Sequence, residues 1–131
     1  MVERDTTADV DWGAVAELIA AVGWGHQDPA ELAVAFGGST HVMFVYEGDV
    51  LVGFGRTVGD GRFYASIVDV VVRPDRQGCG VGRRIVERLQ AVQGFYERLG
   101  WRRQRTAMLL PRDREQERLN CVVEESGNGG S

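Results

Sequence analysis

The sequence contains no lysine, two cysteines, three prolines and no apolar run that could span a bilayer. Without lysine there is no Walker A loop, which ends in Gly-Lys-Ser/Thr. Cys79 and Cys121 cannot form a disulfide framework, and the first residues lack a signal-peptide pattern, so a reducing cytoplasm is expected. The two histidines, His26 and His41, lie far apart in the sequence and give no metal signature.

Charge and composition indicate an ordinary globular chain. The net charge of −4 argues against a general nucleic-acid binder, although all 15 basic residues are arginine. The apolar fraction of 44% and the charged fraction of 26% are typical of soluble globular proteins. A length of 131 residues predicts one domain, which we place at residues 1–119, followed by a flexible tail or linker at residues 120–131.

The N-terminal half predicts two helices and an antiparallel meander. A short strand is expected within residues 1–9. Asp11 can cap a helix that ends at Gly23, and Asp28 with Pro29 can begin a second helix that stops after Phe36. Runs of β-branched and aromatic residues at 41–46, 50–58 and 62–72 predict three strands joined by tight turns. The fold class expected is α/β with a mixed sheet.

A strand, a glycine-rich loop and a helix follow one another between residues 70 and 92. Pro74 ends the strand because it has no N–H for a neighbouring strand, and apolar residues from 81 onward have helical spacing. The first N–H groups of a helix lack internal partners, and glycines let a phosphate approach the backbone. The stretch therefore predicts a phosphate or pyrophosphate site. Arginines suited to phosphate surround it: Arg73, Arg76, Arg83 and Arg84.

The glycine spacing narrows the choice of ligand. A dinucleotide fingerprint needs G-x-G-x-x-G, but Arg83 occupies the position of its third glycine. What remains is Gln77-x-x-Gly80-x-Gly82 between a strand and a helix. This pattern closely resembles the acyl-CoA pyrophosphate loop of the GNAT (Gcn5-related N-acetyltransferase) superfamily, Gln/Arg-x-x-Gly-x-Gly/Ala.

Two further stretches support the resemblance. Residues 93–101, Gln-Gly-Phe-Tyr-Glu-Arg-Leu-Gly-Trp, look like the "FYeklGF" segment near the C-terminus of many GNAT enzymes. Residues 51–70 are similar to a GNAT subgroup that includes plastid serotonin N-acetyltransferase-like proteins. The resemblance covers roughly residues 10–110 and implies the GNAT fold, with a short helix at 95–99 and a strand at 101–110.

One strand of the GNAT pattern has no residues in this chain. In the family, a parallel strand follows the glycine-loop helix, whereas here only the length of that helix separates Gly82 from Phe95. Residues could be missing from the sequence as given, the segment could have been deleted, or another copy could supply the strand by swapping. We favour missing residues, because loss of a core strand would expose apolar surface and destabilise the domain.

The resemblance also implies roles for individual residues. Tyr96 would be the general acid beside the departing sulfur, since a phenol can donate a proton below its pKa of about 10. The alternative for Tyr96 is an aromatic residue that packs in the core. No metal is expected. The residues expected to bind acetyl-CoA are Val70, Val71, Val72, Gln77, Gly78, Cys79, Gly80, Val81, Gly82 and Arg83.

Asp69 is the best candidate for the base that removes a proton from the acceptor amine. An acid within an apolar strand is costly unless it is paired or functional, and an ion pair with an arginine such as Arg56 is an equal alternative. Cys79 lacks an evident histidine partner, so it is interpreted as a structural residue of the loop and not as a nucleophile. Weaker candidates for the base are Glu31, Asp60 and His41. Aromatic residues interpreted as core rather than as pocket walls are Trp12, Trp24 and Phe36.

The expected function is direct transfer of an acetyl group from acetyl-CoA to a primary amine. The acceptor would be a small amine, an arylalkylamine included, or a protein lysine, without nucleic-acid or membrane partners. Homodimers are common in the family. The main rival is a non-catalytic acyl-CoA-binding module, which the missing strand favours, whereas Tyr96 and Asp69 favour an enzyme. An acetyltransferase acting on charged tRNA is a weaker alternative because the chain is acidic.

Overall fold

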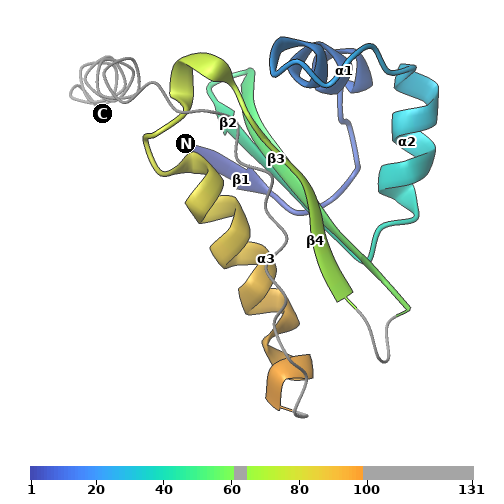
Figure 1. Ribbon diagram of the computed structural model, residues 1–131, viewed down its shortest axis with the longest axis vertical. Helices are drawn as coiled ribbons and strands as arrows, with labels where there is room; N and C mark the ends of the chain where they lie inside the picture. Colours follow the sequence, from blue (N-terminus) through green and yellow to red (C-terminus); the bar gives the residue numbers. More distant parts are fainter. Residues whose placement is uncertain (61–64, 99–131) are drawn as a thin grey trace.

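A four-stranded antiparallel sheet forms the centre of the computed structural model, which describes residues 1–60 and 65–98, with side chains through residue 92. The strands are β1 (Val2–Arg4), β2 (His41–Glu47), β3 (Val50–Gly59) and β4 (Ala65–Val72), and they lie in the sheet in chain order. Helices α1 (Trp12–Ala21) and α2 (Pro29–Gly37) cover one face, and α3 (Val81–Arg98) covers the other (Figure 1).

Helices α1 and α2 begin where the sequence predicts. The carboxylate of Asp11 accepts a hydrogen bond from the N–H of Ala14 at 3.2 Å, and that of Asp28 accepts one from Ala30 at 2.9 Å. These bonds satisfy N–H groups that have no partner within the helix. The three predicted strands of the meander are also confirmed, although residues 61–64 at the start of the last one lie outside the described residues.

Each face of the sheet has its own core. Between the sheet and the α1–α2 layer, the rings of Phe36, Phe44 and Phe54 pack with centroids 5.6–6.3 Å apart. On the opposite face, Ile85 and Leu89 of α3 are fully buried against the sheet. The interpretation of Phe36 as a core residue is therefore confirmed.

Two glycines in β3 bring α3 close to the sheet. A Cβ atom built at Gly55 would lie 2.7 Å from Cγ2 of Ile85, and one at Gly53 would lie 3.0 Å from Cδ1 of the same residue. Real Cβ atoms essentially never approach another heavy atom to 2.7 Å. The absence of side chains at these two positions therefore sets the distance between α3 and the sheet.

Helix α3 is longer than the sequence predicted. We expected it to end near Val92 and a separate short helix to cover residues 95–99, but one helix runs from Val81 to Arg98. The residues between Val92 and Phe95 are helical, so no strand of the GNAT pattern lies between them. The "FYeklGF" segment thus begins as the last turns of the glycine-loop helix. The predicted strand at 101–110 and the predicted tail at 120–131 lie outside the described residues.

Candidate functional site

The glycine loop connects the end of β4 to the first turn of α3. A 3₁₀ turn, η1 (Pro74–Arg76), leads into it. Gly78 has φ +83° and Gly80 has φ +90°, in the left-handed region that favours glycine. The N–H of Arg84 donates to the carbonyl of Gly80 at 2.9 Å, as the first helical hydrogen bond of α3. The N–H groups of Val81, Gly82 and Arg83 come before this bond and have no partner within the helix, so they are available to an external acceptor.

Space around the loop is suited to an anion. A Cβ atom at Gly80 would meet nothing within 4 Å, so the backbone at this residue borders open space. The N-terminus of α3 carries the positive end of the helix dipole, and both features favour a phosphate group there. Gly82 differs, because a Cβ atom at this position would lie 3.3 Å from Cγ2 of Val72. The sequence pattern thus serves both ligand access and close packing of α3.

The arginines around the loop are engaged with carboxylates. Exposed Arg83 pairs with Glu87 at 2.9 Å, one helical turn away, and such exposed pairs contribute little stability. Arg83 can therefore change partners for a phosphate at low cost. The other three predicted arginines are also paired: Arg73 with Asp75 at 2.9 Å, Arg76 with Glu47 at 2.9 Å, and Arg84 with Glu3 at 3.2 Å.

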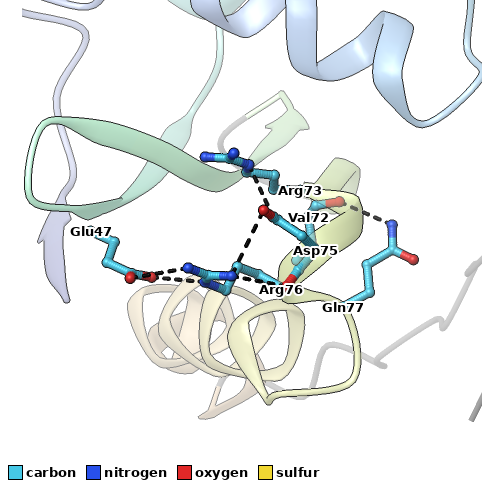
Figure 2. A network of polar contacts seen from close by, with 6 residues as sticks. All are labelled: Glu47, Val72, Arg73, Asp75, Arg76 and Gln77. Carbon is cyan, nitrogen blue, oxygen red and sulfur yellow. Dashed lines mark hydrogen bonds and ion pairs between the residues drawn. The ribbon is translucent and has the colours of Figure 1, made fainter. Parts of the chain in front are cut away.

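Figure 2 shows the polar network at the start of the loop. Both carboxylate oxygens of Glu47 accept hydrogen bonds from Arg76, whose guanidinium also contacts Asp75. The side-chain amide of Gln77 donates to the carbonyl of Val72 at 3.0 Å. The predicted phosphate ligands Arg76 and Gln77 therefore point toward other parts of the protein. Sequence reasoning assigned Glu47 only to a turn and missed its role in this network.

The Arg76 contact also changes the acidity of Glu47. Hydrogen bonding from Arg76 holds the pKa of this carboxyl below its usual value of 4.5. Burial raises the pKa and so opposes this effect, whereas the positive charge of Arg76 lowers it further. Glu47 is therefore ionised at neutral pH and keeps its ion pair with Arg76.

The predicted pantetheine-binding residues form the end of β4. Strand β4 pairs with β3 on one side, and among the described residues no strand pairs with its other edge. Val71 is buried in the core under α1 and α2, whereas Val70 and Val72 pack against the core under α3. The backbone edge at these valines, apart from the Val72 carbonyl that Gln77 contacts, can pair with an extended ligand.

Asp69 lies in a β-bulge next to these valines. Phe54 is opposite Val71 and Arg56 is opposite Val68, so one residue of β3 faces two residues of β4. Asp69 has φ +53°, a left-handed conformation that aspartate tolerates better than most residues. The bulge turns its carboxylate toward Arg56, whose Nε donates to Oδ2 at 2.7 Å.

The ion pair with Arg56, which is the alternative to a role of Asp69 as base, is thus present. The Asp69 side chain nevertheless keeps 39% of its accessible surface, and Oδ2 is the oxygen that Arg56 contacts. Within residues 1–60 and 65–98, Oδ1 accepts no hydrogen bond. A paired carboxylate with one free oxygen can still accept a proton, so Asp69 stays a prediction as the general base.

Arg56 connects the bulge to helix α2. Its Nη1 donates to Oγ of Ser39 at 3.1 Å and to the carbonyl of Ala35 at 3.4 Å. Its guanidinium carbon lies 5.2 Å from the centre of the Phe36 ring, a cation–π distance. Sequence reasoning considered Arg56 only as a partner of Asp69. The position of Arg56 within an apolar strand was the available signal, because a partly buried charge needs several partners.

The remaining candidates are spread over the fold. Tyr96 lies in the last turns of α3, and its side chain is outside the described part. Glu31 is exposed on α2, Asp60 follows β3, and His41 begins β2. The Cys79 thiol donates to the carbonyl of Gln77 at 3.8 Å, within the loop.

Trp12 and Trp24 differ in their surroundings. Trp12 packs on Phe36 with ring centroids 5.4 Å apart, as expected for the core, whereas Trp24 is 36% exposed. In the part of the chain that the structure describes, no group of three potential metal ligands occurs, and no helix is long and apolar enough to cross a membrane.

Comparisons of the sequence with known proteins find similarity to acetyltransferases. Residues 38–103 match the family model described as acetyltransferase (GNAT) domain. The chain is 40% identical over 88 residues to GCN5-related N-acetyltransferase 1, chloroplastic, of Arabidopsis thaliana, covering 66% of this chain and 45% of that protein. It is 34% identical over 119 residues to serotonin N-acetyltransferase 2, chloroplastic, of Oryza sativa subsp. japonica, covering 75% and 60%. The chain thus spans about half the length of these curated relatives.

Solved structures share the fold. A probable acetyltransferase, SA2161 from Staphylococcus aureus, superimposes with a TM-score of 0.62 at 18% identity, covering 85% of this chain and all of that one. An aminoglycoside 6'-N-acetyltransferase complexed with coenzyme A gives a TM-score of 0.64 at 17% identity, covering 74% and 57%. At these identities the likeness concerns the arrangement of helices and strands.

Proposed function

The chain belongs to the GNAT acetyltransferase family, and we propose on this basis that it transfers the acetyl group of acetyl-CoA to a primary amine. Family membership confirms the resemblance noted in the sequence, and the solved structures confirm the predicted α/β fold class. One observation carries the proposal: a loop with left-handed Gly78 and Gly80 leads into the N-terminus of α3, directly after the strand whose edge would bind pantetheine.

Two parts of the site would hold acetyl-CoA. The N–H groups from Gly80 to Arg83 would donate to the pyrophosphate, whose charge the helix dipole stabilises. The edge of β4 at Val70–Val72 would pair with the pantetheine amides and direct the thioester toward the bulge at Asp69. The ligand would then run from the loop along the strand.

The transfer needs a neutral amine and a good leaving group. Asp69, directly or through a water molecule, would take a proton from the ammonium group, and the amine nitrogen would attack the thioester carbonyl carbon. The carbon–sulfur bond then breaks, and Tyr96 would give its phenolic proton to the departing thiolate. The surplus proton on the new amide nitrogen would pass, directly or through water, to the Tyr96 phenolate and restore the phenol. Arg56 would hold the Asp69 carboxylate in place through Oδ2.

The acceptor class is part of the proposal. A small amine, in particular an arylalkylamine, is supported by the name of the rice relative, a serotonin N-acetyltransferase. A protein lysine is the alternative acceptor. A homodimer and a reducing compartment stay predictions from the sequence.

The second candidate function is an acyl-CoA-binding module without catalysis. It is favoured by the course of α3, which continues as helix to Arg98, where the GNAT pattern has a further strand. Thiol release from acetyl-CoA, measured with a panel of arylalkylamines and a lysine peptide, separates the two functions. The enzyme should release coenzyme A only when an amine is present. Binding of acetyl-CoA without amine-dependent release would support the module, and absence of binding would overturn both.

A further inference from the structure

The start of the glycine loop is joined to a distant hairpin by one ion pair. Nε of Arg76 donates to Oε2 of Glu47 at 2.9 Å, and Nη2 donates to Oε1 at 3.2 Å (Figure 2). This two-bond contact between a planar guanidinium and a carboxylate fixes orientation as well as distance. The Arg76 side chain is 16% exposed and that of Glu47 is 27% exposed, so the pair is partly shielded from water.

The remaining nitrogen of the Arg76 guanidinium is also engaged. Nη1 donates to the carbonyl of Asp75 at 3.0 Å and lies 3.8 Å from Oδ2 of the same residue. Asp75 in turn pairs with Arg73 through Oδ1 at 2.9 Å. All three guanidinium nitrogens of Arg76 therefore have protein partners, and these contacts orient the guanidinium toward Glu47 and Asp75.

Glu47 lies at the paired end of a sheet strand. It is the last residue of β2 and pairs with Val50 of β3 across the tight hairpin turn. The N–H of Arg73 donates to the carbonyl of Val52 in the same hairpin at 2.7 Å. The segment before the loop is thus attached to this hairpin by a backbone bond and by an ion pair between side chains 29 residues apart.

We propose that Glu47 and Arg76 form a positioning clamp that holds the glycine loop in its ligand-binding conformation, without Arg76 touching the phosphates. The proposal deepens the proposed function and rests on it for the identity of the ligand. Gln77 follows Arg76 directly, so the clamp fixes the chain one residue before the motif begins. At the other end, Val81 is 3% exposed and packed under the sheet.

A clamp is expected to matter for ligand binding because the glycine loop between Arg76 and Val81 is intrinsically flexible. Glycine has more backbone conformations to lose than any other residue, and the left-handed Gly78 and Gly80 must both be ordered when the ligand binds. A clamp that restricts the loop beforehand removes part of this cost, which would otherwise reduce affinity. Loss of the clamp should therefore weaken acetyl-CoA binding even though neither side chain contacts the ligand.

The alternative is that Arg76 binds phosphate directly, as the sequence suggested, and the two roles predict opposite effects of one substitution. Glu47→Gln removes the charged partner of Nε and Nη2 of Arg76, and with it a negative charge near the loop. If Arg76 were a phosphate ligand, this change would strengthen acetyl-CoA binding or leave it unchanged. If Arg76 is part of a clamp, the same change should weaken binding.

The test is calorimetric titration of acetyl-CoA into the wild type, Glu47→Gln, Arg76→Gln and the double variant. We expect each of the three variants to raise Kd by about three- to tenfold, with the double variant no weaker than Arg76→Gln alone. Glu17→Gln, an exposed change of equal charge on α1, serves as the control and should leave Kd unchanged. Unchanged or tighter binding by Glu47→Gln would overturn the clamp.

Amide hydrogen exchange in the ligand-free protein gives a second readout that needs no binding. The clamp predicts that Glu47→Gln accelerates exchange at residues 77–80 while the core of α3 around Ile85 stays as slow as in the wild type. Unchanged exchange in the loop would refute the clamp. If the wild type does not bind acetyl-CoA, the proposed function fails, and the exchange experiment still decides whether the clamp exists.

Discussion

Replacing Gly55 by alanine should destabilise the protein, because it inserts a methyl group where α3 meets the sheet. The new Cβ would lie 2.7 Å from Cγ2 of Ile85 and 3.3 Å from atoms of Leu89 and Val70. Ile85 and Leu89 are fully buried, so their side chains cannot turn into solvent. Overpacking of this kind costs about 1–3 kcal/mol. The alanine also restricts the unfolded chain, which offsets roughly 0.4–1 kcal/mol.

The net loss of stability should be about 1–2 kcal/mol, equivalent to a decrease in Tm of roughly 4–8 °C for a domain of this size. Thermal unfolding followed by circular dichroism measures it. Gly37→Ala is a matched control, because a Cβ at Gly37 meets nothing within 4 Å and its φ is not positive. An unchanged or raised Tm for Gly55→Ala would refute the idea that β3 glycines set the position of α3.

The same contact can be tested from the opposite side. Ile85→Ala removes the atom nearest to the new methyl group and, as a single change, should cost about 2–5 kcal/mol through the cavity it leaves. In the double variant the alanine at position 55 would fill part of that space. The two losses should therefore sum to more than the loss measured for the double variant, and strict additivity would contradict the proposed contact.

Three further predictions concern the loop and the chemistry. The pKa of Glu47 is lower in the folded protein than its usual 4.5, so its ion pair stabilises the fold above that pH, and this contribution is lost as the pH falls through the folded-state pKa. The Tm difference between wild type and Glu47→Gln should therefore shrink as the pH falls from 7 to 3. A constant difference would be evidence against the pair. Gly80→Glu places bulk and negative charge at a left-handed position that borders the predicted pyrophosphate site, so acetyl-CoA binding should be abolished in a calorimetric titration, and unchanged affinity would rule out the loop assignment. Tyr96→Phe should slow turnover by about 10²–10⁴-fold while acetyl-CoA affinity is preserved, because only the transferable proton is removed; unimpaired thiol release would exclude Tyr96 from the mechanism.

Much of the fold follows from local signals in the sequence. Asp11 and Asp28 begin helices because a carboxylate followed by helix-forming residues can satisfy the first N–H groups. The meander follows from runs of β-branched residues separated by glycine turns. The loop motif follows from the glycine spacing between a strand and a helix, which resembles the pyrophosphate loop of the GNAT family.

Other features depend on contacts that the sequence does not encode locally. Arg76 lies beside the phosphate motif, and only the folded hairpin shows that its partner is Glu47, 29 residues earlier. The bulge at Asp69 arises from a register shift between two strands, which no pattern of residue types reveals. The uninterrupted course of α3 differs from the prediction because the GNAT pattern has a separate short helix there, whereas helix-compatible residues continue through this part of the chain.

Calorimetric titration with acetyl-CoA, with ATP and NAD as controls, tests the central claim most directly. Selective binding of acetyl-CoA with one site per chain is the predicted result, since the loop would hold the pyrophosphate and the β4 edge would recognise pantetheine. Equal binding of all three ligands would mean that the loop recognises phosphate alone. Absence of acetyl-CoA binding would contradict the account.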